Sequence, residues 1–205
     1  MNRIVPFFLL ISSIALSIFL KQGEMLAQFY IPSISLHNFT QVQELDTNSL
    51  CNRFVYHLDD LIDPSISYIQ DYVHVEYPCG DVPANTGVCS DVVVRAFKNI
   101  DICLQQDVHE YRKAKGLSLE RSIDHRRVRN LGPYFASLGW ELDYNSAEDF
   151  SFKPGDIIWW KLGGKTDHIG IVMPNGMVLH NIGNGQVVDV YPHSYQIHKI
   201  YRIKE

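Results

Sequence analysis

The residue whose setting most clearly suggests chemistry is Cys89, in the stretch TGVCSDVVVRAF that runs from Thr86 to Phe97. Apolar residues recur there at helical spacing, which predicts that Cys89 lies in the first turn of a buried helix. The free N–H groups at a helix start favour the thiolate and lower the pKa of a cysteine. A thiolate acts as a nucleophile when a base and an orienting group lie nearby. Cys89 is therefore a candidate catalytic nucleophile.

The best candidates for that base are two of the nine histidines. His168 opens the predicted strand HIGIVM, and His180 lies in the next one, MVLHNI. A three-residue turn at 174–176 would place Gly170 opposite His180 and put both rings on one face of the sheet. A two-residue turn at Asn175-Gly176 would put them on opposite faces, because side chains alternate along a strand. The turn type therefore tests whether the two histidines can act together.

The cysteine count also leaves a structural role for Cys89 open. Cys51, Cys79, Cys89 and Cys103 can form two disulfides in three ways if the chain is exported. No CxxC pair occurs in the sequence, so neither a structural zinc site nor a thiol oxidoreductase is favoured. We predict no metal and no other cofactor.

Length and charge limit the classes of function. The 205 residues, 46% of them hydrophobic, are enough for one domain with a single core. The formal net charge of −5 gives no sign of the basic face that nucleic-acid binding usually requires. We therefore expect one domain that does not bind nucleic acid.

The N-terminus indicates export. Arg3 gives residues 1–27 a positive start, and seventeen uncharged residues follow from Ile4 to Leu20. This run exceeds the usual signal-peptide core and only just reaches the length of a membrane span. A cleaved signal peptide is favoured, and an uncleaved anchor over residues 4–20 is the alternative and the one expected contact with a membrane. Residues 28–48 are polar and are predicted to be a tether. Because the N-terminus indicates export, the protein is expected in the periplasm or cell envelope.

The rest of the chain, residues 49–205, predicts an α+β domain. Helical spacing covers residues 50–62, 89–97, 104–115 and about 131–138, and residues 72–77 are predicted to be extended. Five short segments rich in β-branched and aromatic residues follow, at 157–162, 168–173, 177–182, 186–191 and 195–203. The glycine-containing breaks between them predict an antiparallel meander. The N-terminal helices are expected to pack on this sheet.

With these residues in view, the chain resembles the NlpC-type cysteine peptidases that act on bacterial cell walls and are related to papain. In that group a cysteine starts a helix, a histidine follows on a core strand, and a third polar residue lies on the next strand. The matching positions here are Cys89 in GVCSDVV, His168 in DHIGIV and His180 in VLHNIG. The group also tends to have a tyrosine about a dozen residues before its cysteine, and Tyr77 lies there. The resemblance implies that these residues are catalytic, with Tyr77 as an oxyanion donor.

A closer resemblance is to a bacterial envelope family known mainly as a domain of unknown function with the same NlpC-like fold. The phrases YPCGDVP, GVCSDVV, DHRRVRNL, KPGDIIWW, HIGIV and HNIG carry it, over roughly residues 54–202. Asp91 stands where the peptidases usually have glycine, and its charge beside the nucleophile opposes thiolate formation. Cys79 replaces a glycine of the closer family, and could pair with Cys51 or Cys103 while leaving Cys89 free.

The segment from Ile123 to Arg129 allows two interpretations. His125, Arg126 and Arg127 could form a solvated basic surface with salt bridges, or they could bind a substrate carboxylate, which arginine does bidentately. Together with Tyr77 and Asp91 they make up the predicted oxyanion and substrate-binding set.

The function predicted from these features is an exported cysteine hydrolase that cleaves peptide or amide bonds by acyl transfer through Cys89, His168 and His180. The expected substrate, a peptidoglycan stem peptide or a related amide, is implied by the resemblance alone. Two alternatives remain. An acyltransferase or transamidase would use the same three residues with an amine in place of water, and a non-catalytic envelope binding domain would keep Cys89 buried or disulfide-linked.

Overall fold

The computed structural model describes residues 48–146, 150–190 and 195–205. The predicted signal peptide or anchor, residues 1–27, and all of the predicted tether except Asn48 lie outside the described residues. None of the helices in the described ranges combines the length and the apolarity that crossing a bilayer requires.

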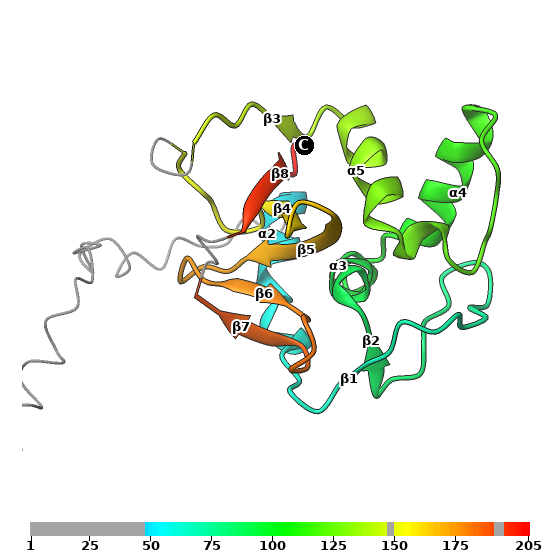
Figure 1. Ribbon diagram of the computed structural model, residues 1–205. Helices are drawn as coiled ribbons and strands as arrows, with labels where there is room; N and C mark the ends of the chain where they lie inside the picture. The colour runs from blue at the N-terminus through cyan, green and yellow to red at the C-terminus, as the bar shows by residue number, and fades with distance from the viewer. Residues whose placement is uncertain (1–47, 147–149, 191–194) are drawn as a thin grey trace, which may run out of the picture. The chain divides into compact units, whose positions relative to one another are not determined.

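The helices come mainly first in the chain, and α3 (Cys89–Lys98), α4 (Leu104–Ala114) and α5 (Val128–Ser137) lie on one side of the sheet (Figure 1). The helix predicted over 50–62 is shorter than expected: α2 (Leu50–Tyr56) ends at Tyr56, and one 3₁₀ turn follows it. Residues 72–77 form no strand. The other helical elements are the 3₁₀ turns η2 (Asp59–Leu61) and η3 (Asp124–Arg126).

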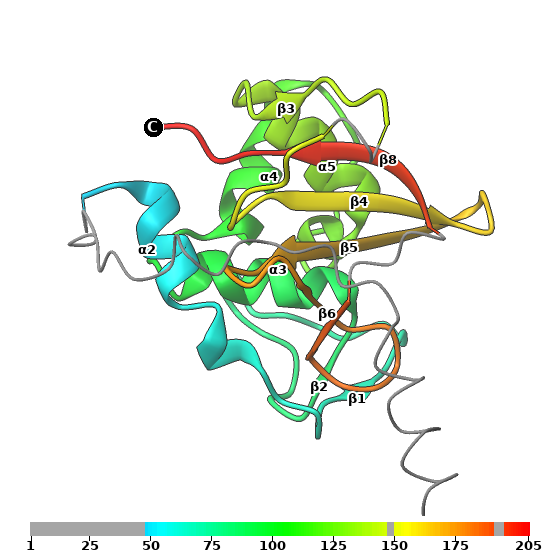
Figure 2. The same ribbon diagram turned by 90° about the vertical axis from the view of Figure 1, so that its left-hand side faces the viewer.

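The main sheet is antiparallel and has the strand order β3-β8-β4-β5-β6-β7 (Figure 2). Only β4 to β7 form the predicted meander, since β8 returns to pair with β4. The first four residues of β4 are all buried, and this strand lies inside the sheet, between β8 and β5. The strands are β3 (Glu141–Leu142), β4 (Ile157–Leu162), β5 (Thr166–Val172), β6 (Val178–His180), β7 (Val187–Asp189) and β8 (Gln196–Tyr201), with a separate parallel pair of β1 (Ser67–Tyr68) and β2 (Thr86–Gly87).

The core has two parts, one on each face of the sheet. Helix α3 packs against β5, and its Phe97 shares the larger apolar cluster with Ile169 and Trp159. Trp160 belongs to the smaller cluster on the other face, because adjacent strand residues point in opposite directions. Both tryptophans are thus core residues. The predicted α+β class is confirmed.

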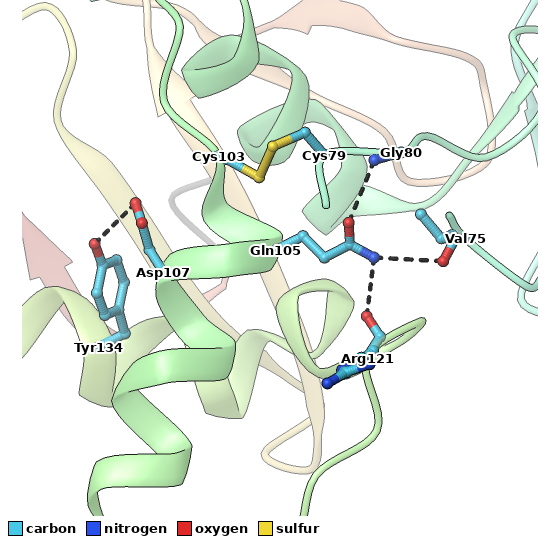
Figure 3. Close-up of a disulfide and its surroundings, with 8 residues drawn as sticks. All are labelled: Val75, Cys79, Gly80, Cys103, Gln105, Asp107, Arg121 and Tyr134. Atoms are coloured by element: carbon cyan, nitrogen blue, oxygen red, sulfur yellow. Dashed lines mark hydrogen bonds between the residues drawn. A yellow bond between two sulfur atoms is a disulfide. The ribbon is translucent and has the colours of Figure 1, made fainter. Parts of the chain in front are cut away.

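One disulfide joins Cys79, in the loop before β2, to Cys103, the N-cap of α4 (Figure 3). Cys51 and Cys89 are free thiols. Of the pairings that the sequence left open, the structure therefore has the one with Cys103, and it leaves the candidate nucleophile unblocked.

The loop that carries Cys79 is also held by the side chain of Gln105 on α4 (Figure 3). The Gln105 amide nitrogen donates to the Arg121 carbonyl at 3.0 Å and to the Val75 carbonyl at 3.5 Å, and its oxygen accepts from the Gly80 N–H at 3.3 Å. Gln105 is 3% exposed. The disulfide and this amide together fix the loop against α4.

Candidate active site

Cys89 is the first residue of α3, and the N-cap is Val88. Valine has no side-chain oxygen that could accept a hydrogen bond from the helix N–H groups. The capping side chain is instead that of a residue inside the helix. The Asp91 carboxylate accepts a hydrogen bond from the Val88 N–H at 2.7 Å. Asp91 therefore fixes the start of the helix at the point where Cys89 lies.

The Cys89 thiol is buried and is protonated at neutral pH. Its exposure is 5%, and burial raises its pKa to about 11. Hydrogen bonds from the Ile169 N–H, the Ser90 N–H and the Tyr68 hydroxyl act in the opposite direction, while the charge of Asp91 raises the pKa further. The expectation of a lowered pKa at the helix start is wrong, because desolvation of the thiolate outweighs the helix N–H groups. Any reaction at this sulfur needs a base.

His168 and His180 form a hydrogen-bonded chain with Asp189 of β7. His168 Nε2 lies 2.8 Å from His180 Nδ1, and His180 Nε2 lies 3.1 Å from Asp189 Oδ2. The carboxylate can only accept, so in neutral rings His180 Nε2 carries a hydrogen and His180 Nδ1 accepts from His168 Nε2–H. This order leaves His168 Nδ1 with a free lone pair. Burial, and then the neighbouring His180, lower the pKa of His168 to about 3, so the ring is neutral at neutral pH.

The turn between β5 and β6 is the three-residue turn that brings the histidines together. Val172 pairs with Val178, and the Met173 N–H donates to the Met177 carbonyl at 2.8 Å. The register places Gly170 opposite His180. A Cβ on Gly170 would lie 3.1 Å from the Cβ of His180, so glycine leaves room for the imidazole pair.

The Cys89 sulfur lies next to Ile169 of β5, and the imidazole pair includes the adjacent residue, His168. No hydrogen bond joins the sulfur to this pair. Cys89 bonds to the Ile169 N–H, whereas His168 stacks on Trp160 and bonds to His180. The described ladder between β5 and β6 covers only Ile171 and Val172, so Ile169 lies beyond it. A hydrogen bond between Cys89 and His168 is not formed in this state. Such contacts often tighten only when substrate is bound.

A cavity of about 230 Å³ lies over Cys89. Residues 88–90 at the start of α3 form one part of its lining, and residues 126–129 at the junction of η3 and α5 form another. Tyr68 of β1 and Asp167 of β5 also line it. The cavity therefore gives a small ligand access to the thiol.

The predicted role of Tyr77 is wrong in position. Its ring lies against His109, with the ring centroids 5.3 Å apart, and under the Arg121 guanidinium at 4.8 Å. Tyr77 does not line the cavity, and Tyr68 takes the place beside the sulfur. Distance along the chain favoured Tyr77, but the segment that crosses the site is β1.

A family model described as "Domain of unknown function (DUF1287)" matches residues 58–203. The chain belongs to this family. It is 37% identical to "Uncharacterized protein YijF" of Escherichia coli (strain K12), in an alignment that covers 60% of this chain and 67% of the relative.

Among solved structures, the chain is similar to "Structure of NlpC1 from Trichomonas vaginalis". The TM-score is 0.41 and the identity 21%, over 73% of this chain. The match spans 42% of that structure, which is less than half its length.

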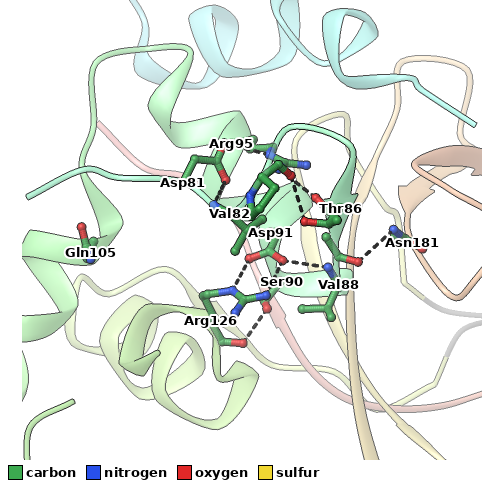
Figure 4. Close-up of polar contacts among 12 residues, drawn as sticks. Asp81, Val82, Thr86, Val88, Ser90, Asp91, Arg95, Gln105, Arg126 and Asn181 are labelled. Atoms are coloured by element: carbon green, nitrogen blue, oxygen red, sulfur yellow. Dashed lines mark hydrogen bonds and ion pairs between the residues drawn. The ribbon is translucent and has the colours of Figure 1, made fainter. Parts of the chain in front are cut away.

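In this DUF1287 domain, Asp91 and Arg126 form a buried ion pair (Figure 4). Arg126 Nε and Nη2 donate to the two Asp91 oxygens at 2.7 and 2.9 Å, and both side chains are at most 5% exposed. The Arg126 carbonyl accepts from the Ser90 hydroxyl at 2.5 Å. The predicted substrate-binding roles of Asp91 and Arg126 are therefore corrected: each binds the other and ties α3 to η3.

The other residues of the predicted basic segment differ from one another. His125 is 2% exposed and does not line the cavity, and burial lowers its pKa to about 4, so it is a neutral core residue and not a substrate ligand. Arg127 lines the cavity, but it also pairs with Glu120 at 2.7 Å. Arg129, which the sequence interpretation passed over, is exposed and lines the same cavity.

Within the described ranges, no group of three or more histidine, cysteine, aspartate and glutamate side chains is arranged to hold a metal ion. The residues that sequence reasoning missed are Tyr68, Asp189 and Arg129. Asp189 could have been found, because it lies in the strand that follows His180. Tyr68 carried no local signal, whereas Arg129 lies in the basic segment from Ile123 to Arg129 and was not singled out there.

Proposed function

We propose that this protein is an exported cysteine hydrolase that cleaves peptide or amide bonds, with peptidoglycan stem peptides as the expected substrate. The observation that carries the proposal is the chain from Asp189 through His180 to His168, which ends one residue from the point where the Cys89 sulfur meets β5. It leaves His168 Nδ1 as an acceptor for the thiol proton. The substrate and the export come from the sequence resemblance and the N-terminal segment.

In the acylation step, His168 Nδ1 takes the proton of the Cys89 thiol as the sulfur attacks the amide carbonyl carbon. A carbon–sulfur bond forms, and the carbonyl oxygen becomes an oxyanion. The Cys89 backbone N–H and the Tyr68 hydroxyl, which lies beside the sulfur, donate hydrogen bonds to it. The carbon–nitrogen bond then breaks, and His168 returns the proton to the leaving amine.

Water completes the reaction by attacking the thioester. His168 takes a proton from the water, the carbon–sulfur bond breaks, and the proton returns to the sulfur. His180 keeps His168 in the tautomer that this cycle requires, and Asp189 does the same for His180. An acyltransferase would differ only here, because an amine would replace the water.

The test compares hydrolysis of peptidoglycan fragments by the wild type and by Cys89→Ala, His168→Ala and His57→Ala. His57 is a suitable control because its recorded ion pair is with Asp60 in an exposed position. We expect both site variants to lose activity by about a hundredfold or more and the control to keep it. Retention of hydrolysis by either site variant would refute the assignment. Mass spectrometry of products formed with an added amine separates hydrolysis from transfer.

A second candidate function, a non-catalytic binding domain, is favoured by one observation. The Cys89 thiol is buried, has a raised pKa and is not bonded to His168. If the rate at which iodoacetamide alkylates Cys89 does not depend on His168, and no fragment is cleaved, the binding domain replaces the hydrolase. A rate that falls in His168→Ala supports the hydrolase.

A further inference from the structure

The cavity over Cys89 carries an excess of positive charge. Its lining contains three arginines, Arg126, Arg127 and Arg129, and one aspartate, Asp167. Asp167 is paired with a lysine of β4, and the guanidinium of Arg126 is occupied by the buried Asp91. The charges that remain for a ligand are those of Arg127 and Arg129.

These two arginines are not equivalent. The Arg127 side chain is 33% exposed and shares its charge with Glu120 at 2.7 Å and Asp124 at 3.7 Å. Arg129 is exposed, and no ion pair or hydrogen bond of its guanidinium is found in the part of the chain that the structure describes. Arg129 therefore keeps its five donors available at the edge of the cavity.

The backbone adds to this charge. Helix α5 begins at Val128, between the two arginines, without a side-chain cap and without an acidic residue in its first turn. Its positive end is thus not neutralised by its own first turn. The two arginines, the helix start and Cys89 all line this cavity.

We propose that this cavity binds a carboxylate, held mainly by Arg129 with support from Arg127, and that the cleaved substrate carries a free carboxylate near its scissile bond. The volume of about 230 Å³ is below that of most sites for drug-sized ligands, so the cavity accepts one small acidic group. The part of this proposal that concerns a substrate rests on the proposed function. The anion site itself does not depend on it.

The experiment uses two alkylating reagents of nearly the same size, iodoacetate and iodoacetamide, which differ in charge. The two rates at Cys89 are measured at one pH by peptide mass spectrometry, and their ratio is divided by the ratio for the urea-unfolded chain. The ratio cancels the thiolate fraction, because the same thiolate attacks both reagents. The variants are Arg129→Gln, Arg129→Lys, Arg127→Gln and, as a control of equal charge change, Lys113→Gln on the exposed face of α4.

We expect the wild-type protein to favour iodoacetate by about fivefold at low salt, since one charge pair in water at contact is worth about that factor. Arg129→Gln should abolish the preference, Arg127→Gln should reduce it less, and Arg129→Lys and Lys113→Gln should retain it. A ratio that is the same in Arg129→Gln as in the wild type overturns the proposal, even if the protein hydrolyses peptides. A preference that depends on Arg129 in a protein without hydrolase activity supports the anion site and refutes only the hydrolase.

If neither reagent reaches Cys89, the same contrast is made with N-acetylglycine and N-acetylglycinamide in a calorimetric titration. Binding of the carboxylate alone, lost in Arg129→Gln, supports the proposal. Equal binding of both compounds, or of neither, overturns it.

Discussion

Replacing Asp91 tests whether this residue, two positions after Cys89, has a structural role. In Asp91→Ala, the Arg126 guanidinium remains buried at 5% exposure without its counter-ion, and the Val88 N–H loses its acceptor. Breaking a buried ion pair costs about 3–5 kcal/mol, and losing a helix cap costs about 1 kcal/mol. The expected loss of about 4–6 kcal/mol is large compared with the total stability of about 5–15 kcal/mol of a typical domain.

The cost should belong to the pair and not to either residue alone. Arg126→Met leaves the Asp91 carboxylate buried, with the Val88 N–H as its remaining donor. The double variant Asp91→Ala with Arg126→Met leaves no buried charge, so it should lose less stability than the two single variants added together. We expect a coupling free energy of about 2–3 kcal/mol, at the upper end for residues in direct contact. Asp91→Asn keeps an oxygen for the Val88 N–H and should be about 1 kcal/mol more stable than Asp91→Ala.

The assay is urea unfolding at pH 7, followed by tryptophan fluorescence, with the free energy of unfolding extrapolated to zero urea. If a single alanine variant does not fold, the comparison of Asp91→Asn with the double variant carries the test. The reasoning is refuted if the single and double variants are additive within about 0.5 kcal/mol. A second readout separates stability from chemistry: the charge of Asp91 raises the pKa of Cys89, so Asp91→Asn should lower this pKa and speed alkylation at a given pH.

Three further predictions concern the disulfide, the pH dependence and the chain of hydrogen bonds. Converting Cys79 and Cys103 to alanine opens a crosslink of sequence separation 24 and should cost about 3–4 kcal/mol in urea unfolding, and a reducing agent should then have no further effect. His125 and His168 are buried and neutral, with pKa values lowered by burial from 6.5 to about 4 and about 3, so the unfolded chain takes up their protons first. Their contribution to the free energy of unfolding is fully present above pH 6.5 and is lost as the pH falls. The loss is about 2 kcal/mol for each histidine at pH 5, and urea unfolding at pH 7 and at pH 5 measures it. Asp189→Ala should lower kcat without changing KM, and the fall should be smaller than the loss of about hundredfold expected when the base is removed. Asp189→Asn should restore part of the lost kcat. An unchanged kcat would exclude a positioning role for this carboxylate.

The parts of the fold that the sequence predicted are those in which local pattern decides the structure. The start of α3 at Cys89 follows from the apolar repeat, and the sequence reduced the pairing of His168 with His180 to a choice between two turns, which the three-residue turn at 174–176 decides. Both depend on a few adjacent residues. The α+β class follows from the change of hydrophobic period along the chain.

The parts that the sequence did not predict depend on long-range contacts. The place of β8 beside β4 is a pairing between distant segments, Ile157 with Tyr201, which no local pattern reveals. Tyr68 replaces Tyr77 at the site because β1 pairs with β2 next to α3. The roles of Arg126 and Arg129 depend on which of the two pairs with Asp91. Spacing along one segment cannot decide which arginine forms this ion pair.

The protonation states of the site restrict how its chemistry can proceed. The Cys89 thiol has a pKa of about 11 and His168 a pKa of about 3, and burial is the main cause of both shifts. A thiolate–imidazolium pair formed before substrate arrives would therefore be strongly disfavoured in the resting site. In the proposed mechanism, the proton therefore moves from the sulfur as the sulfur attacks, so that no buried charge exists without a partner. In the proposed mechanism, the substrate has to bring the sulfur and the His168 ring into contact, and a carboxylate held at Arg129 would place the scissile bond beside Cys89.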